Sequence, residues 1–407
     1  MPQYVQLNVP QKEDADEAKG FTKWAVWACG FRPFFFGGAL AAALLIPAWL
    51  VIFFNGLLAG GPAGPIEWHA HEMIFGFAPA IIAGFLLTAV PKWTRVPVPT
   101  GGMLAVLFGL WLAGRIAMAA AGVLPYGAVA AMDLLFLPAL AVAIAIPIGR
   151  SLTLRNLGFI PLLFGLAVAN TLFHLDHLGV IDGWSMRAID AAMGIVITII
   201  AIVGGRVIPF FTANAVGLPA IDRRRIVDIA AIILTVGWLV CHLVAPTSMA
   251  VAFFALAAGI ANLARMVGWG FTKSLSVPLL WVLHAGYAFV GIGLLLVGVA
   301  GLELAASRTL GIHALTTGAI GILCIGMMAR VSLGHTGRKL VAHRLISIAF
   351  GLAIVAAVVR VFLPWLIPSA YFAAIVSSGV MWTGAWILFL VIYTPILLRP
   401  RADGRPG

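Results

Sequence analysis

The chain has 407 residues, of which 62% are hydrophobic and only 10% are charged. Its mean hydropathy of +1.09 exceeds what the core of a water-soluble protein can use, so the composition excludes an ordinary soluble domain and indicates a chain that lies in lipid. The three cysteines are too dispersed for a thiolate metal cluster or a disulfide framework. Any metal in this chain is therefore expected to be held mainly by imidazole.

Residues 1–23 are polar and mixed in charge, with no visible cleavable signal peptide, and predict a polar N-terminal arm. Between residues 24 and 400, apolar stretches of about 18 residues or more recur, each long enough to cross a hydrocarbon core of ~30 Å. Because they do not alternate strictly, they predict helices rather than a barrel: one all-α polytopic domain of twelve transmembrane helices, with a cytoplasmic tail at 401–407. The predicted spans are 34–55, 71–90, 103–123, 127–148, 157–176, 188–209, 226–244, 249–268, 279–301, 309–329, 343–366 and 371–397.

The net charge of +11 does not indicate nucleic acid as a partner, because the basic residues are distributed by side of the membrane. If the N-terminus is cytoplasmic, only Arg187 and Arg308 fall in loops on the opposite side, which is the positive-inside pattern with both termini in the cytoplasm. Basic blocks at 221–228 and 334–340 are expected to contact the headgroups of membrane lipid, or alternatively an anionic group of a ligand.

The second predicted span opens near WHAHEMIFGF, residues 68–77, which places two imidazoles beside a carboxylate. At about 100° per residue, His69 and His71 point about 200° apart in a helix and could not share one metal ion. The alternative is an irregular backbone, because Gly64 and Pro65 place the start of the helix nearby, with one ring facing inward and the other facing the loop. Glu72 is a candidate proton relay, or an acceptor that orients an imidazole. The alternative for Glu72 is an acidic residue near the start of a helix.

Nine histidines occur in the chain, and a polar ring inside a membrane span is costly unless it is paired, so such positions often mark ligand or proton sites. The alternative for each ring is a hydrogen-bonded bridge between two helices. A cluster of imidazoles without thiolates favours haem or copper. Six histidines lie near the predicted outer ends of their spans and three toward the cytoplasm, namely His69, His71, His174, His177, His242 and His313, and then His284, His335 and His343.

A segment that contains a basic residue and ends in threonine recurs at the ends of the second, sixth and tenth spans, and we call it the exit segment. The three copies are TAVPKWT (88–94), GRVIPFFT (205–212) and ARVSLGHT (329–336). The recurrence predicts a period of four helices, and three such units could surround a pseudo-threefold axis. His71 and His313 occupy equivalent places in this repeat, because each lies 23 residues before the threonine that ends its exit segment. The alternative is chance similarity between apolar segments.

Seven segments together resemble the hallmark sequences of the NnrS family, in the expected order over most of the chain. One departure is PKWTR, where the family is expected to have Asn and Gly in place of Lys92 and Arg95. The matching segments are GFRPFF (30–35), WHAHEMIFGF (68–77), GFLLTAVPKWT (84–94), GRVIPFFT (205–212), LHAGY (283–287), HALTTGAIG (313–321) and ARVSLGHTGR (329–338).

The resemblance implies a bacterial cytoplasmic-membrane protein that contains haem and copper and is associated with denitrification and with nitric oxide. His174 follows the less distinctive segment NTLFHL and is a less secure candidate ligand. The family's histidine-bearing motifs carry the role of metal ligand over to His69, His71, His284, His313 and His335.

The twelve-helix plan is also similar to the core subunit of haem-copper oxidases and nitric oxide reductases, in which helices two and ten provide the axial imidazoles of one haem. By this likeness we expect haem b between His71 and His313 near the outer face, with His69 and His174 as candidate copper ligands. No segment like HPEVY occurs on the sixth span, so the reductase-type copper and high-spin haem site is not transferred.

A second site on the cytoplasmic side is expected from His284 and His335, and the alternative for His335 is a residue that shapes a glycine-rich turn. Three arginines on that side are candidates for neutralising haem propionates, or alternatively for contacting lipid phosphate, namely Arg206, Arg330 and Arg338. Deeper in the spans lie two arginines that need partners and two carboxylates, namely Arg115, Arg360, Asp133 and Asp190.

Three classes of function follow from these expectations. The first is a nitric oxide reductase-type oxidoreductase, in which an unidentified electron donor reduces haem b and nitric oxide is reduced at a metal centre. The second is a sensor or scavenger that binds nitric oxide without turnover. The third is a transporter, which suits a chain of twelve helices and would keep its activity without metal. The imidazole cluster favours the first two classes.

Overall fold

The computed structural model describes most of the chain, and every regular element in the described residues is a helix. Twelve helices, some of them composite, are long and apolar enough to cross a membrane. The predicted all-α class with twelve transmembrane helices is confirmed, and the chain is a multi-pass membrane protein. The predicted arm at 1–23 lies outside the described residues, which are 25–57, 61–151, 154–217, 224–304 and 307–405.

The spans follow one another in three groups of four. The first group is α1 (Phe31–Asn55), a composite of α2 (Pro65–His71), the π-helical segment η4 (Glu72–Phe77) and α3 (Ala78–Thr94), then α4 (Gly101–Ala119), and the broken pair α5 (Tyr126–Asp133) and α6 (Phe136–Ser151). The second group is α8 (Phe159–His177), α9 (Ser185–Val216), α10 (Arg225–Val244) and α11 (Met249–Met266). The third group is α13 (Pro278–Gly301), a composite of α14 (Arg308–His313), the π-helical segment η5 (Ala314–Gly321) and α15 (Ile322–His335), then α16 (Arg344–Leu366) and α17 (Tyr371–Leu398). Short helical turns connect or flank the spans, namely η3 (Ala25–Trp27), α7 (Leu154–Leu157), α12 (Phe271–Ser274) and η6 (Pro368–Ala370).

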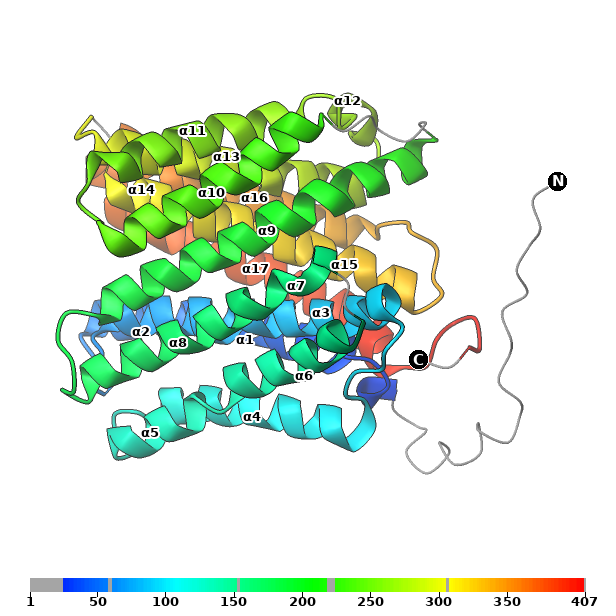
Figure 1. The fold of residues 1–407 in the computed structure, drawn as a ribbon, viewed down its shortest axis with the longest axis horizontal. Helices are drawn as coiled ribbons and strands as arrows, with labels where there is room; N and C mark the ends of the chain where they lie inside the picture. The colour runs from blue at the N-terminus through cyan, green and yellow to red at the C-terminus, as the bar shows by residue number, and fades with distance from the viewer. Residues whose placement is uncertain (1–24, 58–60, 152–153, 218–223, 305–306, 406–407) are drawn as a thin grey trace.

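The spans lie side by side along one long axis of the molecule (Figure 1). Helix α6 packs against α8, α11 packs along α13, and α1 packs along α17, so that each group of four contacts the other two. The second, sixth and tenth spans have the largest buried shares and form the interior of the bundle. Their spacing is that of the predicted four-helix period. The pseudo-threefold arrangement and the cytoplasmic location of the termini stay predictions.

The second span begins earlier than expected, at Pro65 rather than at residue 71. Proline suits the first helical position, because its missing N–H would have no partner there and its fixed φ angle is already helical. Both His69 and His71 therefore belong to the regular helix α2. The predicted divergence of about 200° applies to them, and the two rings face opposite sides of this helix.

Three of the spans are interrupted beside chemically active side chains. The π-helical segment η4 begins directly after His71, and η5 begins directly after His313. Such segments are rare in α-helices and are frequent at functional sites. The fourth span breaks after Asp133, because the ring of Pro138 would clash with the carbonyl of Leu134 in a continuous helix.

Candidate functional site

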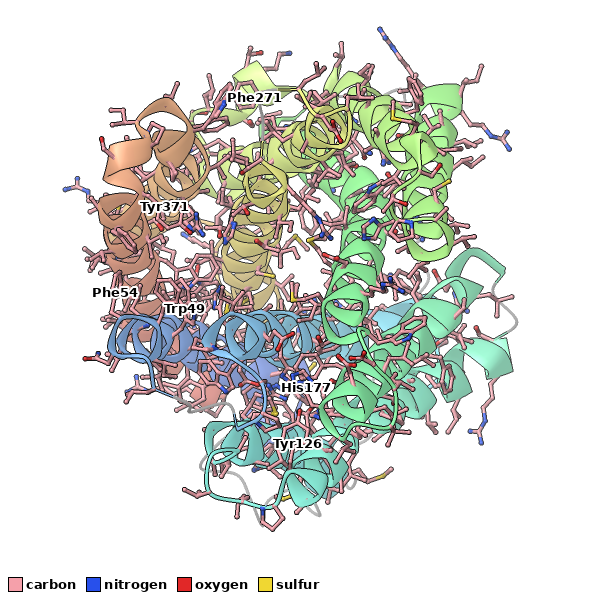
Figure 2. All side chains as sticks on the ribbon, turned by 90° about the vertical axis from the view of Figure 1, so that its left-hand side faces the viewer. Trp49, Phe54, Tyr126, His177, Phe271 and Tyr371 are labelled. Atoms are coloured by element: carbon pink, nitrogen blue, oxygen red, sulfur yellow. The ribbon has the colours of Figure 1, made fainter. Side chains whose placement is uncertain are left out.

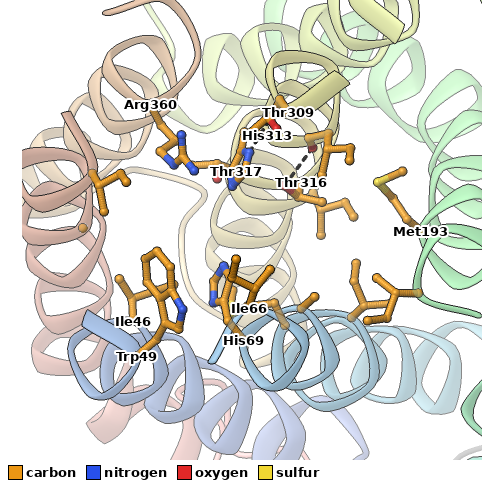
Figure 3. Close-up of a pocket in the computed structure, with 18 of the residues that line it drawn as sticks. Ile46, Trp49, Ile66, His69, Met193, Thr309, His313, Thr316, Thr317 and Arg360 are labelled. Atoms are coloured by element: carbon orange, nitrogen blue, oxygen red, sulfur yellow. Dashed lines mark hydrogen bonds between the residues drawn. The ribbon is translucent and has the colours of Figure 1, made fainter. Parts of the chain in front are cut away.

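A largely apolar cavity of about 290 Å³ is shown in Figure 3. It is lined by residues of α2 and α14, which lie at the same end of the bundle in Figure 1. Side chains of the first, second, sixth, tenth, eleventh and twelfth spans form its wall. His69 and His313 face it from α2 and α14. The volume is close to the lower end of the range of ~300–1,000 Å³ that is typical of small-molecule sites in proteins.

The ring of His313 is held by a backbone contact in one defined form. Its Nδ1 lies 2.9 Å from the carbonyl oxygen of Thr309, one helical turn earlier. A carbonyl oxygen can only accept, so Nδ1 is the protonated nitrogen that donates, and Nε2 of the neutral ring carries the lone pair. This is the tautomer that a metal ligand requires, and the Nδ1–H bond also strengthens Nε2 as a donor.

The ring of His69 is oriented differently, by stacking rather than by hydrogen bonding. Its centroid lies 4.4 Å from that of the Trp49 ring, with 26° between the ring planes. Its Nδ1 is buried and has no hydrogen-bond partner in the described structure. Leaving a buried polar nitrogen unsatisfied costs about 1–3 kcal/mol, so this ring is a candidate for contact with a bound ligand.

Two charged groups also reach the cavity. Arg360 points into it from α16 (Figure 3); in the described part of the chain it has a side-chain hydrogen bond with Tyr371 and forms no ion pair with a carboxylate. Asp190 lines it from α9 and forms an ion pair with Arg308, while the Nε2 atom of His242 lies 3.5 Å from the same Asp190 oxygen. Arg360 is therefore the cationic group that is available to an anionic part of a ligand.

A second group of candidate ligands is buried on the other side of α2. The Oδ2 atom of Asp133 lies 3.0 Å from Nε2 of His174 and 3.3 Å from Nε2 of His71. The three atoms all lie within 4.8 Å of one another, close enough to bind one metal ion. Asn170 joins them, because its Oδ1 lies 3.0 Å from Nε2 of His71 and its Nδ2 donates to Asp133 Oδ2 at 2.8 Å.

The outer nitrogen of each of these two imidazoles has its own partner. Nδ1 of His71 lies 3.1 Å from Oε1 of Glu72, and Nδ1 of His174 lies 3.1 Å from the hydroxyl of Tyr126. A carboxylate fixes Nδ1 as the protonated nitrogen, which leaves Nε2 of His71 to face Asp133. Of the two roles that the sequence suggested for Glu72, the geometry favours the acceptor that orients an imidazole.

Arg115 neutralises this group, which we call the α2 polar cluster and define as Glu72, His71, Asp133, Asn170, His174, Tyr126 and Arg115. Its guanidinium donates to Glu72 through Nη1 and to Asp133 through Nη2. Two glycines make room for these contacts. A Cβ at Gly76 would lie 2.5 Å from Nη1 of Arg115, and a Cβ at Gly114 would lie 2.7 Å from Oδ1 of Asp133.

The structure groups the candidate ligands differently from the sequence hypothesis. His313 shares its cavity with His69 and not with His71, and His174 is grouped with His71 and not with His69. The reason is the opposite orientation of His69 and His71 on α2. Figure 2 looks onto this end of the bundle and shows Trp49 on the side of the cavity and Tyr126 on the side of the α2 polar cluster.

The two histidines that were expected to form a cytoplasmic site, His284 and His335, also lie in different surroundings. His335 lines a further cavity of about 520 Å³ together with Lys92 and Arg206. Nζ of Lys92 lies 3.4 Å from both ring nitrogens of His335, so the departure from the family sequence at Lys92 falls beside a candidate ligand. His284 does not line this cavity, and its Nε2 lies 3.0 Å from the hydroxyl of Thr212.

The three arginines that were expected to meet haem propionates lie away from the histidine cavity. Arg206 lines the cavity of His335, the guanidinium of Arg330 lies 4.1 Å from the centroid of the Phe211 ring, and Arg338 donates to a backbone carbonyl at 3.4 Å. They belong to the ends of α9 and α15 that are remote from α14. They were expected on the cytoplasmic side, and the arginine that lines the histidine cavity is Arg360.

Sequence reasoning did not identify Trp49, Asn170 and Tyr126 as residues of a site. Asn170 gave a weak signal, as an amide inside an apolar span. Trp49 and Tyr126 gave none, because aromatic residues are common near the ends of membrane spans. Only the packing of α1 on α2, and the arrangement of α5 beside α8, brings them to the imidazoles.

The residues of the histidine cavity fit a haem group. Two imidazoles from separate spans face one largely apolar space, and the tautomer of His313 presents a lone pair. Arg360 suits the carboxylate side chains that a haem carries. The unsatisfied Nδ1 of His69 indicates that the protein itself does not complete this site.

Comparison with known proteins is informative at the level of the family. A family model described as NnrS protein matches residues 25–401, which is nearly the whole chain and includes all twelve spans. No curated protein matched the chain. The match covers the histidine cavity and the α2 polar cluster alike.

Proposed function

Because the chain belongs to the NnrS family, we propose that it is a protein of the bacterial cytoplasmic membrane that holds haem b between His69 and His313 and binds nitric oxide there. The observation that carries the proposal is the pair of imidazoles from separate spans that face one largely apolar cavity. A haem held in this cavity would supply an iron atom that binds nitric oxide.

The two imidazoles are unequal as ligands. His313 is fixed by its bond to the Thr309 carbonyl, which keeps the ring in one orientation and raises the donor strength of Nε2. His69 is held by stacking on Trp49 and has no acceptor for its Nδ1. If haem is held here, His313 would therefore be the stronger of its two ligands and His69 the weaker.

The other residues of the cavity provide a largely apolar wall with one anion-binding position. In apolar surroundings electrostatic attraction is stronger than in solvent. Arg360 supplies a fixed positive charge for a carboxylate of the ligand. Asp190 is the carboxylate that lines the cavity in the described residues, whereas Glu72 faces the α2 polar cluster. If nitric oxide is reduced here, Asp190 is the better candidate for proton supply.

We include copper and an unidentified electron donor in the proposal because of the family resemblance, and not because of the geometry of the cavity. The described cavity offers two imidazoles, which the haem would use, so a copper ion needs ligands elsewhere in the chain. Binding alone would make the protein a sensor or scavenger of nitric oxide. Turnover would make it an oxidoreductase, and transport would not depend on haem.

Spectroscopy on the full-length protein in detergent separates these functions. We expect the purified protein to contain haem b and its reduced spectrum to change when nitric oxide is added without oxygen. Consumption of nitric oxide beyond one equivalent per haem, with an artificial electron donor, indicates turnover, and consumption that stops at one equivalent indicates a sensor or scavenger. A His343→Ala protein, altered at the cap of α16 outside the cavity, serves as the control. Protein that contains no haem, or whose spectrum is unaffected by nitric oxide, would contradict the proposal.

A further inference from the structure

The α2 polar cluster has the donor set of a second metal centre, separate from the histidine cavity. We propose that His71, His174 and Asp133 hold one divalent first-row transition metal ion, with the carbonyl oxygen of Asn170 as a fourth ligand. The proposal is independent of haem binding, because none of these four residues lines the histidine cavity.

The spacing of the donor atoms suits such an ion. Bonds of ~2.0–2.1 Å to a tetrahedral metal place neighbouring ligand atoms about 3.3 Å apart. Oδ2 of Asp133 lies 3.0 Å from Nε2 of His174 and 3.3 Å from Nε2 of His71. Oδ1 of Asn170 lies 3.0 Å from the same His71 nitrogen. These three separations are close to those of a tetrahedral coordination shell, and the ligand atoms of His71, Asp133 and His174 all lie within 4.8 Å of one another.

The partners of the two imidazoles also match those of metal-binding histidines. A metal-binding imidazole usually donates its other N–H to a carboxylate, a carbonyl or water, which fixes the tautomer. Glu72 takes this role at Nδ1 of His71, and the Tyr126 hydroxyl lies at Nδ1 of His174. Glu72 is itself fixed by Arg115. Both Nε2 atoms are thus left to point at Asp133.

The balance of charge leaves a place for one further positive charge. Glu72 and Asp133 are two buried carboxylates, and among the described residues Arg115 is the guanidinium that pairs with them. With neutral imidazoles the cluster keeps one negative charge buried inside the bundle, which is costly. Either an additional proton on an imidazole or a bound metal ion supplies the missing positive charge. Two nitrogens and two oxygens around one point favour the metal.

The chemistry of the donors restricts the ion to a few candidates. Imidazole with carboxylate suits iron(II), copper(II) and zinc(II), and a pair of histidines with one carboxylate is the donor set of non-haem iron sites in particular. Metal ions that prefer thiolate ligands are disfavoured, because the cluster contains none of the three cysteines, Cys29, Cys241 and Cys324. The site is too crowded for a porphyrin and differs in this respect from the histidine cavity.

Metal analysis of the full-length protein tests the proposal. Protein in detergent is washed with a chelator, dialysed separately against iron(II), copper(II) and zinc(II), and analysed by mass spectrometry, with haem iron subtracted after a separate haem assay. We expect wild type to retain about one non-haem metal ion per chain from at least one of the three solutions. Asp133→Asn and His174→Gln should lower this amount at least tenfold. The control His177→Gln lies one turn further along α8, where the ring contacts Glu67, and should retain the wild-type amount.

X-ray absorption on the loaded wild-type protein keeps the test independent of variant folding. We expect nitrogen and oxygen ligands near ~2.0–2.1 Å with the outer-shell scattering of imidazole, and no sulfur near ~2.3 Å. Three results would overturn the proposal: no metal retained by wild type from any of the solutions, sulfur ligands at the bound metal, or wild-type retention in both Asp133→Asn and His174→Gln.

Discussion

The two imidazoles of α2 differ in how completely their ring nitrogens are satisfied. On the side of His71, both ring nitrogens have partners, and Arg115 joins two carboxylates. On the side of His69, the Nδ1 atom has no partner in the described structure, and Arg360 lines a cavity. The unpartnered Nδ1 of His69 beside this cavity therefore suits contact with a bound ligand.

The difference in space is as instructive as the difference in bonding. The His69 side holds about 290 Å³ of cavity between six spans, whereas the donor atoms on the His71 side are separated by hydrogen-bond distances. A large flat ligand can enter only the first, whereas the second has room for a single ion at most. By our two proposals, one helical segment presents two imidazoles to two kinds of cofactor.

The largest effect on stability is expected when the α2 polar cluster loses the guanidinium of Arg115. Arg115→Leu leaves two buried carboxylates without their guanidinium, and breaking a buried ion pair costs about 3–5 kcal/mol. Thermal unfolding of the purified protein should show a large decrease in stability. The comparison variant is Arg308→Leu, whose side chain is 57% exposed although its partner Asp190 is buried, and for which we expect a smaller decrease. Equal losses for the two variants would contradict this view of the cluster.

Removal of either cavity imidazole should reduce haem content, and by unequal amounts. His313 is anchored by the Thr309 carbonyl and His69 is not, so we expect His313→Ala to lose nearly all of the haem and His69→Ala to retain a five-coordinate fraction. Haem per chain and the reduced absorption spectrum measure the difference. A greater loss in His69→Ala than in His313→Ala would reverse the assignment of the stronger ligand.

A smaller effect is expected at the charged edge of the cavity. Arg360→Gln removes the positive charge that we assign to a haem carboxylate but leaves both imidazoles in place. Haem should dissociate several-fold faster while the reduced spectrum of the bound fraction stays as in wild type. Competition with apomyoglobin measures the rate. A changed spectrum would show that Arg360 acts on the axial ligands instead.

The smallest effect is expected for an arginine–aspartate pair in water, which serves as the baseline for Arg115. Arg401 lies at Asp403 with an N–O distance of 2.6 Å and lowers the pKa of this exposed carboxyl to about 2. A depressed pKa adds stability above the unfolded value near 4, and that stability is lost only as the pH falls through about 2. The contribution is constant between pH 5 and pH 8, and solvent screens it. Asp403→Asn should therefore change the unfolding temperature only slightly relative to wild type, and by the same amount at every pH in this range. A difference from wild type that varies with pH between 5 and 8 would contradict the expectation.

The fold was predictable because lipid imposes one rule on every span. Each apolar stretch had to form a helix that satisfies its own backbone groups, and hydropathy alone located all twelve. The opposite orientation of His69 and His71 was predictable as well, because it depends only on the rotation of about 100° per residue within one helix. The start of α2 was misplaced, because the polar residues before His71 lower the local hydropathy.

The pairing of the imidazoles could not be predicted, because it depends on how whole spans are rotated against one another. His71 and His313 precede similar π-helical segments and lie at equal distances from the ends of their spans, yet they face different sites. Residues of a π-helical segment no longer follow the α-helical phase, so sequence spacing across η4 and η5 does not give the direction of a side chain. Arg115 was recognised as an arginine that needs a partner and Asp133 as a carboxylate within a span, but their contact could not be predicted because it depends on the break in the fourth span.

The haem content of three histidine variants tests the central claim most directly. His69→Ala, His313→Ala and His71→Gln are purified under identical conditions, and haem per chain is measured with the reduced spectrum. If haem lies in the cavity between His69 and His313, the first two variants lose haem or change its coordination, and His71→Gln keeps the wild-type spectrum. Loss of haem in His71→Gln together with a wild-type spectrum in His69→Ala would contradict the account.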